Sequence, residues 1–309
     1  MQVLITERIH ESGIDLLRRD GVNVDLLYKT DQPLADAIRE ADGIVVRLAK
    51  ITENIMRIGK IGKLKVVAKH GIGVDNIDVE AARRLGIRVV YTPGVMSDAV
   101  AEFTLGAILF LAKNFVKYDS EVRKGNWGIR YYANNLEIKG KTVGLIGYGH
   151  IGKKVAKLAN CLGAHLIVYD PYVQIQETHV KQADLNTVLK DSDFLSIHVP
   201  LTKDTYHLIG RKELELVDGL YIINSARGGI IDEVAFCEAV EKGKVAGAVL
   251  DTTEQEPIAL DNPILHSENV ILTAHTAGIA DVAQVDESIL ACRQVLQVLK
   301  GEEPPYSLA

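Results

Sequence analysis

The chain has 309 residues, of which 47% are hydrophobic and 25% charged, and its net charge is −6. This length predicts two domains, and the negative charge disfavours nucleic acid or an anionic membrane as the main partner. Three scattered cysteines with no CxxC pair indicate a reducing compartment and no zinc site. The N-terminus has an early acidic residue, Glu7, and no long apolar run. We therefore expect a cytoplasmic protein without a signal peptide.

Short apolar runs alternate with helical patterns over the first third of the chain. This alternation predicts a parallel, doubly wound α/β domain with helices on both faces of the sheet. The expected strands are Val3–Thr6, Val24–Tyr28, Gly43–Leu48, Lys65–Lys69 and Arg88–Tyr91, and the expected helices lie near Glu11–Arg19, Leu34–Ala41, Asn54–Gly59 and Val79–Leu85.

An apolar helix is expected over Ala99–Ala112. It is too short to span a bilayer, which needs about 20 apolar residues. A helix that is apolar on nearly all sides is typically buried between domains or subunits. This helix therefore separates the first series of elements from the second.

A second series of strands and helices begins at Lys141. Six parallel strands with intervening helices fit a Rossmann domain. A last helix, Val282–Leu299, could pack on either domain by chain order. The six expected strands are Thr142–Ile146, Leu166–Asp170, Phe194–Val199, Leu220–Asn224, Val245–Asp251 and Val270–Thr273.

A glycine-rich motif, Gly147-Tyr148-Gly149-His150-Ile151-Gly152, follows the first strand of this second series and opens a helical pattern. Asp170 ends the next strand. Together they have the context of a dinucleotide-binding fingerprint, in which the glycines allow a tight turn and close approach of the pyrophosphate. The helix N-terminus favours the phosphates. Asp170 would bind the ribose hydroxyls and repel a 2′-phosphate, so the motif predicts NAD rather than NADP.

Polar residues also stand at the ends of the later strands, where ligands bind in open α/β sheets. We expect Arg227, Glu256 and His275 to converge on one rim of the second domain. The segments at these ends are His198-Val199-Pro200, Asn224-Ser225-Ala226-Arg227-Gly228-Gly229, Asp251 with Glu256 on the following loop, and His275.

These three residue types suit hydride chemistry on a 2-keto acid. A guanidinium can bind a carboxylate in bidentate fashion. Histidine can deliver a proton to a carbonyl oxygen near neutral pH, and a carboxylate on its other ring nitrogen fixes the tautomer. Taken singly, Arg227 could be a surface residue, Glu256 a solvated charge and His275 a structural histidine. Their combination with a dinucleotide site favours catalysis.

The sequence resembles the D-isomer-specific 2-hydroxyacid dehydrogenases over nearly its whole length. This family contains phosphoglycerate dehydrogenase, D-lactate dehydrogenase and glyoxylate/hydroxypyruvate reductase. The resemblance rests on Gly71-Ile72-Gly73-Val74-Asp75-Asn76-Ile77-Asp78, the glycine-rich motif, His198-Val199-Pro200-Leu201-Thr202, Asn224-Ser225-Ala226-Arg227-Gly228, Leu250-Asp251, Glu256-Pro257 and His275-Thr276-Ala277-Gly278.

The resemblance implies roles for individual residues. Arg227 would bind the substrate carboxylate, His275 would be the acid/base and Glu256 its partner. Asp251 would hold the nicotinamide carboxamide, and the backbone N–H groups of Ile72 and Gly73 would hold the substrate carboxylate. We expect NAD to contact Gly147, Tyr148, Gly149, His150, Ile151, Gly152, Asp170, His198, Val199, Pro200, Ser225, Ala226, Asp251 and Gly278.

The resemblance also implies a domain organisation. A flavodoxin-like substrate domain would contain residues 1–95 and 285–309, so that the last helix returns to it. A Rossmann NAD-binding domain would contain residues 96–284, with a helix near 97–118 that builds a homodimer. The expected partner is a small 2-keto or 2-hydroxy acid, with no metal, nucleic acid or membrane.

Two segments depart from the common pattern of the family. Thr252 and Thr253 replace a Val-Phe pair that usually follows the aspartate, and Ala274 stands where proline is usual before the histidine. Neither change removes a chemical group, but both can reshape the site. The substrate therefore does not transfer with the resemblance.

A second anionic group on the substrate is suggested by cations at strand ends of the first domain. Arg47 ends the third expected strand and Lys69 the fourth, Lys50 follows Arg47 in the next loop, and Arg130 lies in a long loop. They would suit a phosphate or distal carboxylate, as in 3-phosphoglycerate, and phosphoglycerate dehydrogenases have an arginine in a similar Val-Arg context. The alternatives are solvated edge charges and a substrate of the glyoxylate, hydroxypyruvate or D-lactate type.

Two other functions share this scaffold. Formate dehydrogenases move a hydride without a proton and have glutamine beside the histidine, so Glu256 counts against that activity. A non-enzymatic NAD(H)-sensing protein could keep all three catalytic residue types. The sequence contains no long disordered tail or docking segment, which favours the enzyme.

Overall fold

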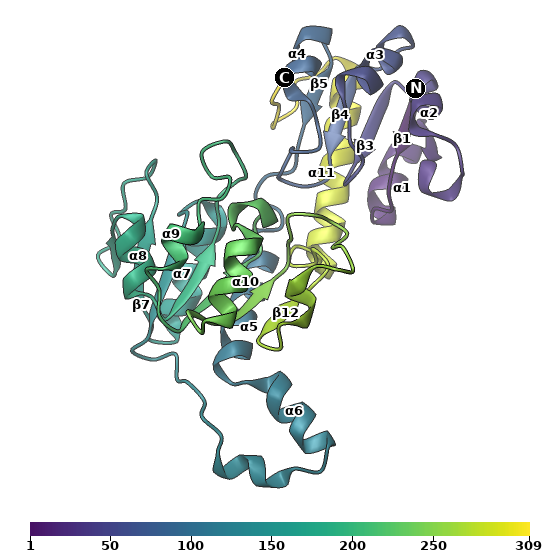
Figure 1. The fold of residues 1–309 in the computed structure, drawn as a ribbon. Helices are drawn as coiled ribbons and strands as arrows, with labels where there is room; N and C mark the ends of the chain where they lie inside the picture. The colour runs from purple at the N-terminus through teal and green to yellow at the C-terminus, as the bar shows by residue number, and fades with distance from the viewer. The chain divides into compact units, whose positions relative to one another are not determined.

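The computed structural model describes all 309 residues, which form two compact units. Unit 1 contains Met1–Met96 and Ile279–Ala309, and unit 2 contains Ser97–Gly278. In Figure 1 the purple, blue and yellow segments with β1–β5 form unit 1, and the teal and green segments form most of unit 2. Each unit is built on a parallel sheet of its own, which confirms the predicted α/β class.

Unit 1 has a five-stranded parallel sheet in the order β2-β1-β3-β4-β5, which is the flavodoxin-like order. The order reverses between β1 and β3, so the loops after these two strands flank a switch point, where ligands bind in such sheets. The strands are β1 (Gln2–Ile5), β2 (Asn23–Leu26), β3 (Gly43–Val46), β4 (Val66–Lys69) and β5 (Arg88–Val90).

Helices cover both faces of this sheet, because alternate side chains of its strands point to opposite sides. In β3, Ile44 and Val46 pack in one core with α3 and α4, whereas Val45 packs in the other with α1 and α11. The last helix therefore belongs to unit 1. The helices are α1 (Glu11–Arg19), α2 (Leu34–Ala37), α3 (Glu53–Ile61), α4 (Val79–Leu85) and α11 (Asp281–Lys300), with short 3-10 turns η1 (Leu27–Lys29) and η2 (Ile38–Glu40).

A buried polar network ties the ends of β4 and β5 to α11. His70 Nδ1 lies 3.1 Å from Glu287 Oε2, and the two side chains are 2% and 4% exposed. The Thr92 hydroxyl donates to Glu287 Oε1 (3.0 Å) and accepts from the Gly71 N–H (2.9 Å). The network therefore fixes the start of the segment that contains Ile72 and Gly73.

Unit 2 has a seven-stranded parallel sheet in the order β12-β11-β10-β9-β6-β7-β8, a Rossmann order whose switch point lies between β6 and β9. The sequence predicted six of these strands and missed β8, a three-residue edge strand in which Lys181 and Gln182 are exposed. The strands are β6 (Thr142–Ile146), β7 (His165–Tyr169), β8 (Val180–Gln182), β9 (Phe194–Ile197), β10 (Leu220–Asn224), β11 (Val245–Leu250) and β12 (Val270–Leu272).

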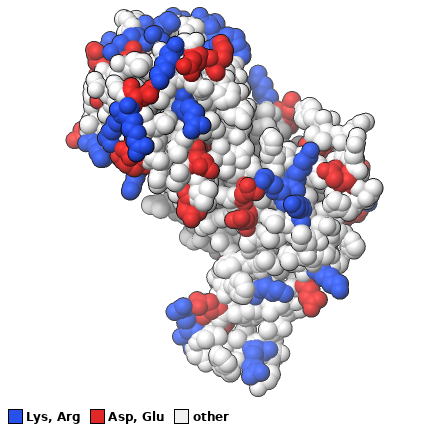
Figure 2. Space-filling model, turned by 180° about the vertical axis from the view of Figure 1, so that it is seen from behind, with Lys and Arg blue, Asp and Glu red and all other residues white.

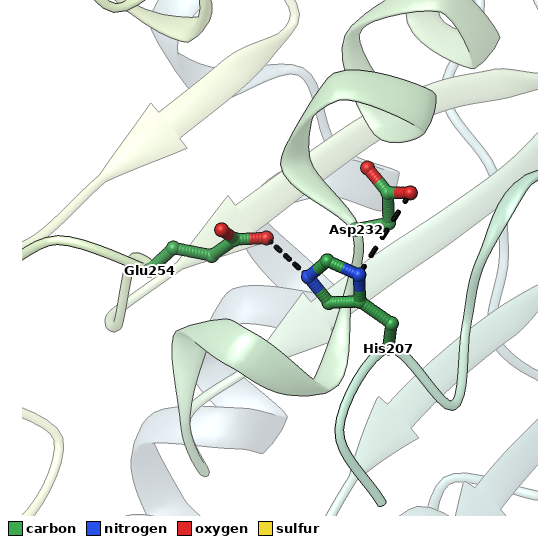
Figure 3. Close-up of side chains that lie close together, drawn as sticks. All are labelled: His207, Asp232 and Glu254. Carbon is green, nitrogen blue, oxygen red and sulfur yellow. Dashed lines mark hydrogen bonds and ion pairs between the residues drawn. The ribbon is translucent and has the colours of Figure 1, made fainter.

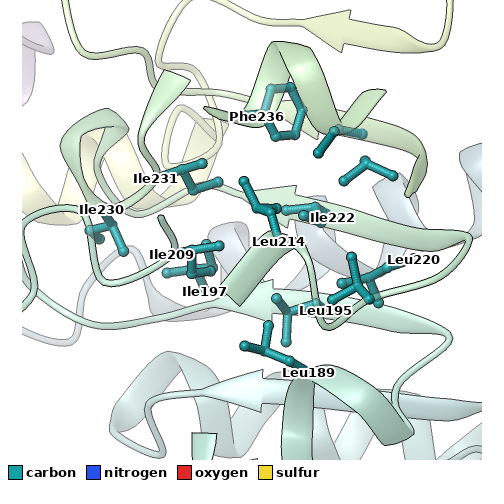
Figure 4. Packing of buried hydrophobic residues seen from close by; sticks show 14 of the residues in the cluster. Leu189, Leu195, Ile197, Ile209, Leu214, Leu220, Ile222, Ile230, Ile231 and Phe236 are labelled. Carbon is teal, nitrogen blue, oxygen red and sulfur yellow. The ribbon is translucent and has the colours of Figure 1, made fainter. Parts of the chain in front are cut away.

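Two apolar cores fix this sheet between its helices. Figure 4 shows the core in which Leu195 and Ile222 of the strands meet Phe236 of α10. On the other face, α5 and α7 pack on alternate strand residues such as Val143 and Ile223. The helices are α5 (Ser97–Ala112), α6 (Phe115–Arg123), α7 (His150–Cys161), α8 (Leu185–Asp191), α9 (Arg211–Leu214) and α10 (Glu233–Glu241), with 3-10 turns η3 (Trp127–Tyr131), η4 (Gly228–Ile230) and η5 (Pro263–His266).

The apolar helix of the sequence is α5, which ends at Ala112, and α6 begins after Asn114, whose φ is 51°. No helix alone has the length and hydropathy of a membrane span, and α5 with α6 reaches them only across a bend of 55°. Figure 1 shows α6 and the segment after it as an arm that leaves the sheet of unit 2. On the face drawn in Figure 2, basic and acidic side chains are interspersed, without a broad surface of one sign.

The buried network of unit 1 gives a stability prediction. Glu287→Ala would remove the carboxylate that faces buried His70 Nδ1 and the Thr92 hydroxyl, which should cost about 3–5 kcal/mol. Hydrogen exchange of β4 and α11 measures this loss within unit 1. The control Arg18→Ala removes an exposed pair with Glu11 and should change exchange far less. Equal exchange in the two variants would contradict the structural importance of the network.

Candidate functional site

The glycine-rich loop after β6 has the shape of a phosphate cradle. Gly147 has a φ of +96°, and a Cβ there would lie 2.6 Å from the His198 carbonyl oxygen. A Cβ on Gly152 would lie 2.3 Å from the Gly147 oxygen, whereas the space beside Gly149 is open. The helix α7 begins at His150, directly after this opening. The loop therefore fits a dinucleotide whose phosphates approach the N-terminus of α7.

Asp170 directly follows β7 and is fixed beside this loop. One carboxylate oxygen accepts from the Tyr148 N–H (2.8 Å) and the other from the Tyr172 N–H (2.9 Å). Tyr148 itself is 3% exposed. Burial and the nearby Glu177 carboxylate raise the pKa of the Tyr148 hydroxyl. The fixed negative charge of Asp170 suits ribose hydroxyls and disfavours a 2′-phosphate.

His198 follows β9 on the other side of the switch point. Burial lowers the pKa of its ring to about 3, so the ring is neutral. Its Nε2 is buried and has no hydrogen-bond partner within the chain. Its backbone lies against Gly147, which explains why only glycine is accommodated there. Val199 and Pro200 continue from it, and their contacts with a cofactor stay predictions.

Arg227 is placed by the turn that follows β10. Asn224, which is buried, accepts from the Ala226 N–H (3.1 Å) and donates to the Arg227 carbonyl oxygen (2.8 Å). The Arg227 guanidinium also donates to the Ala226 carbonyl oxygen (2.7 Å). The sequence predicted that Asn224 lies at this strand end but not that it holds the turn. The groups that Asn224 binds belong to the backbone, and a pattern of side chains does not reveal them.

The loop after β11 packs directly on this turn. A Cβ on Gly228 would lie 1.9 Å from the carbonyl carbon of Thr253 and 2.4 Å from the nitrogen of Glu254. No other residue than glycine permits this approach without displacing one of the two loops. The position of Arg227 is therefore coupled to the loop that carries Glu256.

Glu256 and His275 form the pair that the sequence predicted. His275 Nδ1 lies 2.9 Å from Glu256 Oε2, and the side chains are 38% and 37% exposed. Burial raises the pKa of the Glu256 carboxyl, but the hydrogen bond and charge of His275, the Thr253 N–H and the charge of Arg227 outweigh it. The pKa of Glu256 is lowered overall, so it is a carboxylate at neutral pH. Three of the predicted groups thus interact.

Asp251 holds the segment that presents His275. Asp251 is 1% exposed, and its carboxylate accepts from the backbone N–H groups of Thr276 (2.7 Å) and Ala277 (2.8 Å). Its carbonyl oxygen accepts from the His275 N–H at 2.8 Å. His275 has a φ of 54°, a left-handed conformation that needs such support. The expected contact of Asp251 with a nicotinamide carboxamide stays a prediction.

In unit 1, Arg47 and Glu7 flank the switch point between β1 and β3. The Glu7 carboxylate accepts from the backbone N–H groups of Arg47 (2.8 Å) and Ala49 (2.6 Å), which fixes the loop after β3. The Arg47 guanidinium donates to the carbonyl oxygen of Arg8 (3.1 Å). Sequence patterns gave no indication of this role for Glu7.

Lys69 was expected to bind the substrate, but its side chain is buried and bonded within unit 1. It is 8% exposed, and its ammonium group donates to the Arg47 carbonyl oxygen and to Asn76 Oδ1 (2.8 Å). The structure thus gives Lys69 a role in joining two loops of unit 1. Lys50 is exposed. Arg130 belongs to the arm of unit 2, where its guanidinium lies over the Tyr131 ring.

Unit 2 is by its fold and its loop a dinucleotide-binding domain. Residues 105–277 match the model of the family described as D-isomer specific 2-hydroxyacid dehydrogenase, NAD binding domain. The chain belongs to this family. The match confirms the resemblance noted in the sequence and the prediction of NAD as cofactor.

Relatives are similar over nearly the whole chain. A D-3-phosphoglycerate dehydrogenase of Methanocaldococcus jannaschii is 40% identical over 98% of this chain, which spans only 58% of that relative. A glyoxylate reductase of Thermofilum pendens is 38% identical, with 98% and 93% of the two chains covered. A crystal structure of a Thermus thermophilus protein has a TM-score of 0.92 and 32% identity, with both chains fully covered.

The fixed carboxylate of Asp170 predicts the choice of cofactor. The value of kcat/KM should favour NADH over NADPH by at least about tenfold, which corresponds to about 1.4 kcal/mol. Asp170→Asn should reduce this preference, because the charge is lost while the side chain can still accept from Tyr148. Equal use of both cofactors by the unmodified protein would mean that Asp170 does not face the ribose.

Proposed function

We propose that this protein is an NAD-dependent dehydrogenase that interconverts a small D-2-hydroxy acid and its 2-keto acid. The observation that carries this proposal is the 2.9 Å contact of His275 with Glu256, in reach of the charge of Arg227. A carboxylate bound to one imidazole nitrogen orients the ring and stabilises its protonated form, so the other nitrogen can act as a general acid. A guanidinium beside it is the usual ligand of a substrate carboxylate.

The proposed chemistry divides among these groups. When bound, NAD(H) supplies or accepts the hydride. His275 Nδ1 is engaged by Glu256, so its Nε2 is the atom that gives a proton to the carbonyl oxygen during reduction and removes it during oxidation. The Glu256 carboxylate stabilises the imidazolium before the proton leaves. Arg227 binds the carboxylate and polarises the carbonyl, and the N–H groups of Ile72 and Gly73 are proposed as further carboxylate ligands.

The substrate is proposed to carry a second anionic group. Relatives are named D-3-phosphoglycerate dehydrogenase, glyoxylate reductase and hydroxypyruvate reductase, so names alone leave both kinds of substrate open. Arg47 favours a substrate with two anionic groups, because the loop that contains Arg47 lies at the switch point of unit 1 and is fixed by Glu7. A phosphorylated or dicarboxylic 2-keto acid would match this cation.

A homodimer in the cytoplasm is proposed as the working state. The arm of unit 2 exposes large hydrophobic side chains, with Phe115 at 51%, Trp127 at 67% and Tyr132 at 83%. Large apolar side chains exposed on one segment support an interaction site there. The three cysteines are free, in keeping with a reducing compartment.

Steady-state oxidation of NADH with a panel of 2-keto acids tests the proposed activity. The panel contains 3-phosphohydroxypyruvate, hydroxypyruvate, glyoxylate and pyruvate. Turnover of at least one of them is expected. NADH binding without turnover of any would instead support a non-enzymatic sensor.

The proton donor gives a first mutational prediction. His275→Ala should lower kcat by about 10²–10⁴-fold, the usual contribution of a positioned general acid. The affinity for NADH, measured by fluorescence titration, should stay the same because the glycine-rich loop is untouched. An unchanged kcat would remove His275 from the mechanism.

The second anion gives another prediction. Arg47→Ala should raise KM for 3-phosphohydroxypyruvate by about tenfold or more, for a lost charge-assisted hydrogen bond of about 1.5–3 kcal/mol. KM for glyoxylate should change much less. Arg57→Ala, which removes an exposed arginine of α3, serves as the control. If glyoxylate or pyruvate is the better substrate, or if Arg47→Ala affects all substrates alike, the second-anion proposal is wrong.

A further inference from the structure

A histidine and two carboxylates outside the proposed catalytic set come together in unit 2. Figure 3 shows the ring of His207 between Glu254 and Asp232. His207 Nε2 lies 2.8 Å from Glu254 Oε1, and Nδ1 lies 3.9 Å from Asp232 Oδ2. The three side chains are each about one-third exposed. No step of the proposed mechanism uses them.

The orientation of the ring argues against a metal site. Each ring nitrogen faces a different carboxylate, so one ion could not bind the histidine and both acids unless the ring turned. The carboxylates also have partners at the N-terminus of α10. Asp232 accepts from the Ala235 N–H (3.0 Å), and Glu254 accepts from the Glu233 N–H (3.1 Å). The cluster is therefore a hydrogen-bonded junction.

The junction joins the two loops that carry the proposed catalytic groups. The His207 backbone N–H donates to the Gly229 carbonyl oxygen (2.8 Å), two residues after Arg227. Its side chain binds Glu254, two residues before Glu256. The backbone of Thr253 and Glu254 lies against Gly228. His207 thus bridges the Arg227 turn and the Glu256 loop.

We propose that His207 is a positioning residue, which through Glu254 holds residues 252–257 against the Arg227 turn and thereby sets the contact of Glu256 with His275. This proposal rests on the proposed function for its effect on catalysis. The physical reason is that the Glu256 loop has little regular structure, so its place depends on a few such contacts. A shift of about 1 Å at a reacting group can cost about 10²-fold in rate.

The groups around the junction define the effect of losing it. Asp232 and Glu254 face His207, the Glu233 carboxylate accepts from the Glu254 N–H, and His275 and Arg227 face Glu256. When the loop moves, Glu256 loses part of its contact with His275. The hydrogen bond and the charge of His275 lower the pKa of Glu256. That pKa should then rise, and activity that needs the carboxylate should be lost at a higher pH as the pH falls.

A pair of substitutions separates the side-chain contact from the backbone. His207 has a φ of 51°, and asparagine tolerates this left-handed conformation well. His207→Asn is too short to reach Glu254, whereas the amide nitrogen of His207→Gln can replace Nε2. Glu254→Ala and the double variant His207→Asn/Glu254→Ala complete a double-mutant cycle for the His207–Glu254 contact. Lys181→Ala, which removes an exposed ion pair with Asp191 elsewhere in unit 2, is the control.

Kinetics with NADH and the best 2-keto acid of the panel give the first readout. His207→Asn should lower kcat by about tenfold or more and move the acidic limb of the pH–rate profile to higher pH, with unchanged NADH affinity. His207→Gln should restore most of the activity and the profile. The double variant should be no slower than the slower single variant, because the two single changes share the loss of the His207–Glu254 contact. Lys181→Ala should behave as the unmodified protein.

Hydrogen exchange of the 252–257 and 225–231 peptides gives a readout that needs no turnover. Exchange should be faster in His207→Asn and near normal in His207→Gln. The positioning proposal is overturned if His207→Asn keeps normal exchange, normal kcat or a normal pH profile, or if the two single effects multiply in the double variant. A different result separates the two proposals. If the unmodified protein turns over none of the 2-keto acids but His207→Asn still exchanges faster, the proposed function is wrong and the positioning of the loop by His207 is supported.

Discussion

The buried carboxylate of Asp251 is the constraint on which the candidate site depends. It is nearly inaccessible to water, and four hydrogen bonds from Thr273, Thr276 and Ala277 compensate its desolvation. These bonds hold His275 in a left-handed conformation that few residues adopt without support. An apolar residue at position 251 would leave the N–H groups of Thr276 and Ala277 without their acceptor, and the segment would lose the conformation that presents His275.

The other proposed catalytic groups depend on this segment in turn. Glu256 reaches His275 because its loop leaves β11 directly after Asp251 and packs on Gly228. Arg227 is fixed from the other side by Asn224 at the end of β10. Three neighbouring strand ends therefore present one carboxylate, one imidazole and one guanidinium. The chemistry is a consequence of how closely these three loops pack.

Unit 1 uses the same device for a different purpose. The Glu7 carboxylate holds the Arg47 loop by its backbone, and the His70–Glu287 pair anchors the start of the segment with Ile72 and Gly73. In both units one side chain fixes a loop through backbone N–H groups or buried partners, and a different residue of that loop is proposed to bind a ligand. Lys69 is a residue that fixes a loop, although its position at a strand end suggested that it binds a ligand.

The sequence predicted the features that have a local or repeated signal. Alternation of strands and helices predicted both sheets, and the spacing of the glycine-rich motif and Asp170 predicted the cofactor loop. His275 and Glu256 were predictable because strand ends of a parallel sheet meet at one edge. The junction of His207, Asp232 and Glu254 was not, since its members are far apart in sequence and each resembles an ordinary surface charge. The edge strand β8 was missed because it has only three residues and two are exposed.

The pH dependence of kcat/KM for the unmodified protein and for Glu256→Gln tests the central claim most directly, which is that Glu256 and His275 work as one proton-transfer pair. In the direction of keto-acid reduction, the unmodified protein should lose activity at low pH as Glu256 is protonated, and at high pH as the proton donor is lost. In Glu256→Gln the acidic limb should disappear and the basic limb should move to lower pH, because the imidazolium has lost its charged partner. Two identical profiles would contradict this account of the site.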